Sequence, residues 1–336
     1  MATHFFAAID DSGIPKPVCD WDGNEIPADF PYVGLAAFVL AEHKLEELES
    51  RWTFLRKKIH RKLGLSHRDP LPPIHLRWMW GRNPPLAKGL NPYVDADFRD
   101  IRSWLTDARR ILTSLLQDSE GAAIYSEFRE RSAFVEDQKP YYTDPQFTAE
   151  LKYLRAHRLR GRTGKLYGLY HSITSNPVIR LLAVILWRLE QDLRRTGATV
   201  EVHVDKFSSS SGIDAEVVLS TSHKLARLSQ VTSLQQIDDY SASALCQAAD
   251  VIAYSVNRIA LIGNRKIQHD SRFVEALWPL INAGTSFSGH PITEPAVISN
   301  DAVQSTLCVV YALAHQQLSK RAPEFVVENL VSIEEF

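Results

Sequence analysis

The amino-acid sequence predicts an α/β protein in which helices cover a sheet. Two apolar runs with strand character stand near the N-terminus, at residues 4–10 and 32–41. A strict alternation of apolar and polar residues at 199–207 predicts another strand in the second half of the chain. Long segments with apolar residues at helical spacing separate and follow these strands. Strands interleaved with helices are typical of layered α/β architectures.

Between the early strands and the later one, the chain carries charged helices and a proline-rich segment. Residues 43–64 combine helix-period apolar positions with heavy charge, which predicts a solvated helix. Residues 95–117 place acids early and arginines late, as the helix dipole favours. Between these helices, the prolines of residues 69–85 interrupt regular structure and place His75 in a constrained loop or short strand.

Two further helices flank the later strand. Residues 176–197 enter a helix at an Asn-Pro pair and leave it at Gly197, following the preferences of proline for helix starts and glycine for helix ends. Residues 243–261 are helical by periodicity, with Ser241 or Ser243 as the N-cap. A helix on each side of the strand completes the alternation expected of an α/β layer.

The order of these elements divides the chain into four predicted parts. Residues 1–42 hold the first strands of the sheet core, and residues 43–175 form a mostly helical insertion or cap. Residues 176–265 complete the core. Residues 266–336 form a helical C-terminal extension, whose last helix packs one apolar side internally or against a second copy in a homodimer. That side consists of Leu307, Val310, Ala314 and Leu318.

Composition and charge place the chain among soluble cytoplasmic proteins. Its 336 residues carry a net charge of -2, so any basic surface has to be local. The three cysteines are far apart and form no CxxC pair, which argues against a zinc ribbon or disulfide framework and suits a reducing compartment. No signal peptide is predicted, and the longest apolar run is interrupted by Arg180 and Arg188 and too short to cross a membrane.

Three aspartates stand at defined points of these elements. Asp10 ends the first strand, Asp205 ends the later one, and Asp250 lies within an otherwise apolar helix. Carboxylates that converge repel one another unless a cation intervenes, and oxygen ligands favour Mg²⁺ or Mn²⁺. Such ions activate water and stabilise displacement at phosphorus. A solvated turn for Asp10 and a loop or capping contact for Asp205 are the alternative interpretations.

The helix around Asp250 separates polar from apolar residues. Gln247, Asp250, Tyr254 and Asn257 follow one another at steps of three and four residues and form one polar stripe. The stripe contains no cation within one turn of Asp250. Because burial of an unpaired charge is costly, Asp250 needs a partner from elsewhere in the fold.

Four short blocks mark these same elements in order. Residues 9–13 read IDDSG at the end of the first strand, and residues 74–78 read IHLRW. VDK ends the later strand at 204–206, and ADVIA lies within the helix at 249–253. In this order the blocks resemble the bacterial family called domain of unknown function 3800, whose first block reads I-D-E-S-G and whose second reads I-H-x-R-x-x-W. Asp11 therefore replaces a glutamate, and the second block carries tryptophans at both Trp78 and Trp80.

The resemblance implies an RNase H-like mixed sheet core with flanking helices and a metal-dependent nuclease site. In such a core the first catalytic aspartate lies on the first strand, the second on a later strand and another on a late helix. This assigns catalysis and metal binding to Asp10, Asp205 and Asp250. His75, in the second block, either positions water, binds the leaving oxygen or completes the metal shell, or is held structurally by the prolines and tryptophans around it.

Two basic stretches are candidates for contact with nucleic acid. The first is a glycine-containing segment with interleaved tyrosines, a composition that suits phosphate binding and base stacking. Its central cations are Arg158, Arg160, Arg162 and Lys165. The second stretch, residues 56–62, lies on the early charged helix and is interpreted as a solvated face.

The leading hypothesis is therefore a Mg²⁺- or Mn²⁺-dependent phosphodiesterase that hydrolyses DNA or RNA. A catalytically inactive RNase H-like module that binds nucleic acid or a protein partner is the alternative. A hydrolase of small phosphorylated molecules is a third hypothesis. No GxSxG, HExxH or GxGxxG motif supports a different catalytic class.

Overall fold

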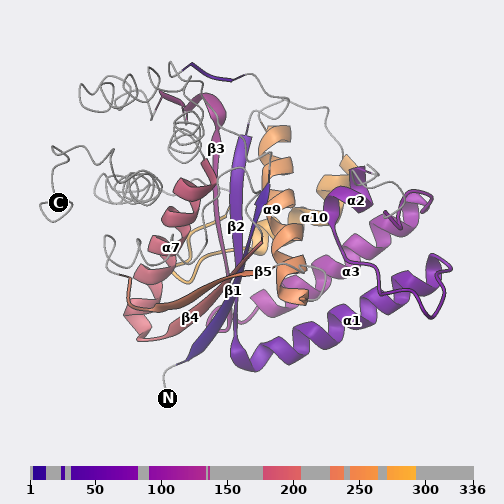
Figure 1. Ribbon diagram of the computed structural model, residues 1–336, viewed down its shortest axis with the longest axis horizontal. Coiled ribbons are helices and arrows are strands. Elements are labelled where there is room, and N and C mark those ends of the chain that lie inside the picture. Colours follow the sequence, from indigo (N-terminus) through magenta and orange to yellow (C-terminus); the bar gives the residue numbers. More distant parts are fainter. Residues whose placement is uncertain are drawn as a thin grey trace, which may run out of the picture.

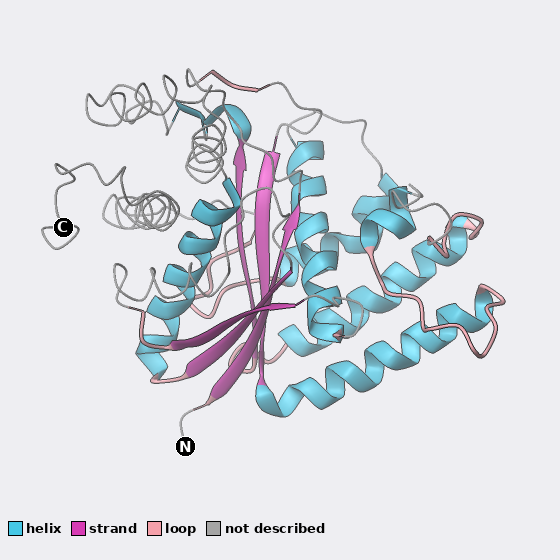
Figure 2. Cartoon of the chain, viewed as in Figure 1, coloured by secondary structure: helices cyan, strands magenta, loops and turns pink. Residues whose placement is uncertain are grey.

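The computed structural model describes residues 3–12, 24–26, 32–81, 91–133, 135–136, 177–205, 228–237, 243–263 and 271–292. Within these residues, five strands form one mixed sheet, and helices lie on both sides of it (Figures 1 and 2). The α/β class predicted from the sequence is therefore confirmed as a mixed sheet with flanking helices. The predicted helix near the C-terminus lies outside the described residues.

The sheet is built around β1, His4–Ser12. β2 (Tyr32–Ala41) pairs with β1 in antiparallel orientation, and β3 (Ala122–Glu130) pairs with β2 in the same way. On the other side, β4 (Thr199–Asp205) runs parallel to β1, and β5 (Val231–Ile237) runs parallel to β4. The strand order is β3-β2-β1-β4-β5, so the carboxyl ends of β1 and β4 lie side by side.

One face of the sheet is covered by α9, Ala244–Gly263, which packs on β1 and β2. Around α9 lie α1 (Leu45–Lys62), α3 (Phe98–Leu116) and α10 (Ser271–Ala283), on the same side of the sheet in Figure 1. The largest fully buried side chains of this face are Trp52, Tyr93, Phe38, Leu40, Leu48, Ile59 and Ile74. Burying each such side chain contributes about 1.5–3 kcal/mol, so this layer is the main core.

The opposite face is covered by α7, Pro177–Thr196, which contacts β2 and β3 (Figure 1). The predicted end of this helix is confirmed: Gly197 has a φ of 69°, a conformation that side chains other than glycine rarely adopt. The N–H of Ala198 then bonds the carbonyl of Leu193 at 3.2 Å and closes the last turn. The chain turns directly into β4.

Helix ends elsewhere also follow their sequence signals. Ser243, one of the two predicted caps, accepts a hydrogen bond from the N–H of Cys246 at 3.3 Å at the start of α9. Asp97 caps α3 by accepting from the N–H of Arg99 at 2.7 Å. A short 3₁₀ helix, Glu42–Lys44, leads from β2 into α1. These local contacts fix where each helix begins.

Two strands and one helix were not predicted from the sequence. β3 lies within residues 43–175, the range expected to be mostly helical, and it reads AAIYSEFRE without strict alternation. β5 reads VTSLQQI and buries only Val231 and Leu234. Both strands gain their stability from pairing with a neighbour, which leaves little periodic signal in the strand itself. The unpredicted helix is α2, Leu76–Gly81.

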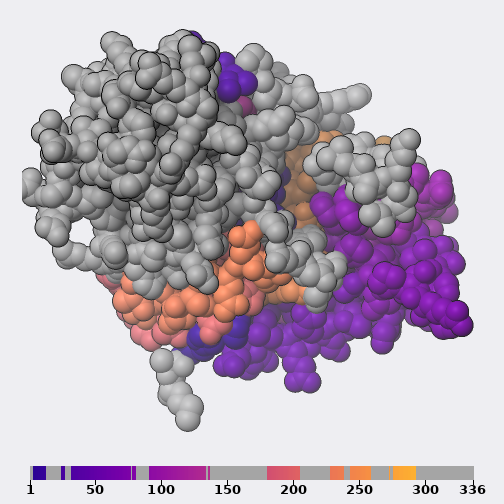
Figure 3. Space-filling view, viewed as in Figure 1, coloured from indigo at the N-terminus to yellow at the C-terminus, as the bar shows by residue number. Residues whose placement is uncertain are grey.

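The helices α1 and α3 form one side of the molecular surface, at the lower right of the space-filling view (Figure 3). Among the residues that the structure describes, no helix combines the length and the apolar character needed to cross a membrane.

Candidate functional site

Asp10 and Asp205 stand at the carboxyl ends of two neighbouring parallel strands. The register of β1 and β4 pairs Ile9 with Val204, so the next residue on each strand is an aspartate. Neighbouring strands are about 4.8 Å apart. The backbone therefore brings these two predicted site residues to the same level of the sheet. Ligands of open α/β sheets bind beyond the carboxyl ends of the strands, which is where this pair lies.

Asp10 is largely buried, with 7% of its surface exposed. Its Oδ1 accepts a hydrogen bond from the N–H of Asp11 at 2.7 Å. Residues two apart on a strand point to the same face, so Asp10 and Ser12 share the face of Ala8. Ala8 belongs to the core beneath α9. The Asp10 carboxylate therefore belongs to the α9 face of the sheet.

Two hydrogen bonds fix the direction of α9 over the sheet. At its start, Glu49 Oε1 of α1 accepts from the N–H of Ala244 at 2.9 Å. Because α1 follows the end of β2, this contact lies toward the amino end of β1. Near its other end, Asn257 Nδ2 donates to Ser12 Oγ at 2.9 Å. The helix thus runs in the same direction as β1.

Asp250 lies on the same side of α9 as Asn257, two turns earlier. Seven residues of helix correspond to about 10 Å along its axis. The step from Ser12 back to Asp10 is about 7 Å along the strand. Asp250 and Asp10 therefore lie within about 4 Å of one another in level along β1. The topology brings all three predicted aspartates to one region.

The polar stripe of α9 anchors the segment 74–76. Asp250 Oδ2 accepts from the N–H of Leu76 at 2.8 Å. One turn earlier, Gln247 Oε1 accepts from the N–H of Ile74 at 2.8 Å and from Trp52 Nε1 at 3.1 Å. The stripe predicted from the sequence is therefore a docking strip for a segment far away in the chain.

His75 lies against Asp250, as the last residue before α2. Its Nδ1 is 3.5 Å from Asp250 Oδ1, and its ring stacks on Trp78 with a centroid distance of 4.9 Å and an interplanar angle of 16°. The side chain is 25% exposed. The stacked ring and the burial of its Nδ1 agree with the structural interpretation, and the partial exposure of a ring that lies beside a carboxylate agrees with the catalytic one. Both interpretations of His75 therefore stay open.

His203 is a titratable neighbour to which the sequence analysis gave no role. It stands two residues before Asp205 on β4 and pairs with Ala8 of β1. Burial lowers the pKa of His203, although the nearby charge of Glu201 opposes this effect. The ring is therefore neutral at neutral pH. The sequence did contain a signal for this position, because His203 alternates with the valines of β4 and so lies on the same face of the strand as Asp205.

The two predicted basic stretches have different outcomes. The segment with Arg158, Arg160, Arg162 and Lys165 lies outside the described residues, so its role stays a prediction. The stretch 56–62 lies on α1, where Arg56 donates to the carbonyls of Leu71 and Pro72 at 2.5 and 3.0 Å. Lys58 and Lys62 form ion pairs with acids of α3 at 2.6 and 3.6 Å. This stretch agrees with the predicted solvated face.

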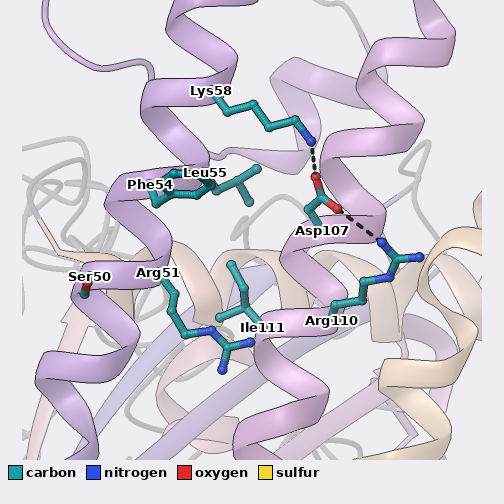
Figure 4. A pocket seen from close by; sticks show the side chains of 8 residues that line it. All are labelled: Ser50, Arg51, Phe54, Leu55, Lys58, Asp107, Arg110 and Ile111. Carbon is teal, nitrogen blue, oxygen red and sulfur yellow. Dashed lines mark hydrogen bonds and ion pairs between the residues drawn. The ribbon is translucent and has the colours of Figure 1, made fainter.

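A groove of about 540 Å³ lies between α1 and α3 (Figure 4). Phe54 on its rim is 67% exposed. Asp107 pairs with Lys58 at 2.6 Å and with Arg110 at 3.5 Å, so these cations are neutralised locally. The groove contains none of the predicted catalytic residues. We therefore place the candidate site at the carboxyl ends of β1 and β4.

The predicted ligands at this place are of the type that a metal centre needs. Aspartate oxygens are the ligands that Mg²⁺ and Mn²⁺ prefer. Among the side chains that the structure describes, no group of three or more His, Cys, Asp or Glu is arranged to hold a metal ion. The side chain of Asp205 is not one of those described. The three-aspartate metal site therefore stays a prediction.

No family model, curated protein or solved structure matches the chain. Membership of the family suggested by the four sequence blocks accordingly stays a prediction as well.

Proposed function

We propose that the protein is a divalent-metal-dependent phosphodiesterase that hydrolyses DNA or RNA, built on an RNase H-like core. The observation that carries this proposal is the β1–β4 register, which follows the Ile9–Val204 pair with Asp10 and Asp205 on adjacent parallel strands. A late helix that carries Asp250 and packs on β1, the strand of Asp10, adds support. A mixed sheet with acids at these points is what the sequence blocks imply.

In this proposal Asp10, Asp205 and Asp250 hold Mg²⁺ or Mn²⁺. Both Asp10 and Asp250 are buried, and carboxylates gathered in a buried region need a cation to offset their repulsion. When bound, the ion would supply an activated water and offset the charge that develops at phosphorus. Mg²⁺ typically retains several waters, which suits such a reaction.

The remaining candidate residues are assigned to binding the substrate and to positioning the reacting groups. Asp250 holds the N–H of Leu76 and thereby fixes His75 at the edge of the site. We assign to His75 the task of holding the attacking water or the leaving oxygen. Binding of the substrate's phosphates is assigned to the basic segment, whose four central cations are Arg158, Arg160, Arg162 and Lys165.

The test is cleavage of end-labelled single- and double-stranded DNA and RNA by the full chain with Mn²⁺ or Mg²⁺. We expect Asp10→Asn to lower the cleavage rate by about a hundredfold or more, because a ligand charge is lost at the metal. Asp11→Asn is the matched control: this acid is adjacent but points to the opposite face of β1, so its rate stays within about threefold of wild type. No metal-dependent cleavage of any strand contradicts the proposal.

A second candidate function is binding of nucleic acid or a protein without turnover. It is favoured by one observation: Asp250 already serves the fold through Leu76 and His75. In a gel-shift assay, equal retardation of nucleic acid by wild type and Asp10→Asn, together with absent cleavage, would favour the binding module.

A further inference from the structure

Asn257 carries a buried polar atom that has no hydrogen-bond partner among the described residues. The side chain is only 4% exposed, and its Nδ2 donates to Ser12 Oγ at 2.9 Å. Its Oδ1 is buried, and none of the described residues donates a hydrogen bond to it. Buried polar atoms are nearly always hydrogen-bonded, so an unpaired amide oxygen requires an explanation.

The contrast with Gln247 strengthens this observation. Gln247 is a second buried amide on the same stripe of α9, and its Oε1 accepts from both Trp52 Nε1 and the N–H of Ile74. The fold therefore satisfies one amide oxygen of the stripe twice and the other not at all within the described chain. An external group is the natural partner for the Oδ1 of Asn257.

The unused oxygen lies in the corner between β1 and α9 where the candidate site is placed. Ser12, which holds the amide, is on the same face of β1 as Asp10 and two residues beyond it. Asn257 is on the same side of α9 as Asp250, two turns beyond it. The amide therefore joins the two elements near their carboxyl ends, about 7 Å beyond Asp10 along β1 and about 10 Å beyond Asp250 along α9.

We propose that Asn257 Oδ1 is a further oxygen ligand on the Asp10 side of the metal, bound directly or through one of the metal's waters. The inference rests on the proposed metal-dependent function. Side-chain amide oxygens are ordinary ligands of hard divalent cations. Being neutral, the amide adds a donor without adding to the repulsion among the aspartates. The bond to Ser12 holds Nδ2, so the oxygen is the atom presented to the ion.

The test is Mn²⁺ binding to the full chain by isothermal titration calorimetry, with thermal unfolding in EDTA as the check of folding. We expect Asn257→Leu, which has a similar volume and no oxygen, to weaken Mn²⁺ binding by about tenfold or more. Asn257→Asp restores an oxygen and adds a charge, so it is expected to bind Mn²⁺ at least as tightly as wild type. Ser12 Oγ can donate to the new carboxylate, which preserves the contact.

Ser255→Ala is the matched control for a buried polar loss in the same turn. Its Oγ donates to the carbonyl of Val251 within the helix, so its removal leaves the Mn²⁺ affinity within about twofold. The variant reports on whether general disturbance of α9 changes metal binding.

The outcomes separate the inference from the function on which it rests. If wild type binds no Mn²⁺, or Asp10→Asn binds it as well as wild type, the proposed metal site fails and the inference falls with it. If Asp10→Asn abolishes binding while Asn257→Leu leaves it unchanged, only the inference is overturned. If Asn257→Leu and Asn257→Asp weaken binding equally and unfold at equally lower temperatures, Asn257 is structural and the inference is again overturned.

Discussion

The two faces of the sheet bury carboxylates beside different partners. On the α7 face, Glu127 of β3 lies 3.6 Å from Arg188, and Glu190 lies 2.7 Å from Arg194. Both acids are fully buried, and α7 itself supplies both arginines. The counter-charge is therefore part of the fold, and these acids need no ion from solution.

On the α9 face, Asp250 accepts a hydrogen bond from the N–H of Leu76 and lies beside His75, which is charged only when protonated. No arginine or lysine among the described residues pairs with Asp250. A buried carboxylate whose neighbours carry no permanent positive charge still favours a nearby cation. Asp10 lies at nearly the same level of the sheet. The difference indicates that the α7 acids stabilise the fold, and it supports our proposal of a metal ion on the α9 face.

The largest expected effect is that of Glu190→Ala. Glu190 accepts hydrogen bonds from three successive N–H groups, residues 229–231, at 2.7 to 3.2 Å, and so holds the entry to β5. Its removal takes the acceptor from these three N–H groups, of which that of Val231 is buried, and the ion-pair partner from Arg194. Because several hydrogen bonds to a charged group are lost together, we expect a loss of about 3–5 kcal/mol in the free energy of unfolding, measured by urea denaturation. Glu201, an acid of β4 whose side chain is 34% exposed, provides the control: Glu201→Gln is expected to cost less than about 1 kcal/mol.

An intermediate effect is expected in the pH dependence set by Glu127. Burial raises its pKa to about 7, although Arg188, Arg129 and Arg180 oppose the increase. The folded state then binds more protons at Glu127 than the unfolded state does, so the contribution of Glu127 to stability is fully present below about pH 4.5 and is lost as the pH rises through about 7.

Relative to Glu127→Gln, which does not titrate, wild type should lose about 2–3 kcal/mol of unfolding free energy between pH 4.5 and 7. Urea titrations of both proteins across this range measure the difference. Parallel stability curves for the two proteins would show that Glu127 is ionised throughout and belongs to an ordinary ion pair.

The smallest expected effect on the fold is that of Asp250→Asn. The amide oxygen still accepts from the N–H of Leu76, so the metal-free protein should change by less than about 1 kcal/mol. The increase in unfolding temperature caused by Mn²⁺ should disappear with the charge. Differential scanning calorimetry with and without Mn²⁺ measures both. A loss above about 3 kcal/mol without metal would make Asp250 a structural acid like Glu190.

Part of the candidate site could be predicted from the sequence. Asp10, Asp205 and Asp250 were identified by their places on strands and a helix, and the structure brings their backbones to one region. The contacts of Asp250 with residues 74–76 could not be predicted, because they join segments far apart in the chain. The hydrogen bond between Asn257 and Ser12 could not be predicted either, because the polar stripe of α9 does not show which residue each polar side chain will contact.

By itself, the sequence determined the helices α1, α3, α7 and α9 and the strands β1, β2 and β4. Their periodicity and end signals act over a few residues, as Gly197 and Ser243 illustrate. Only the tertiary structure decided the strand order, the strands β3 and β5, and the common level of Asp10 and Asp205. Strand register is set by hydrogen bonds between distant segments, and a shift of one residue would turn a side chain to the other face.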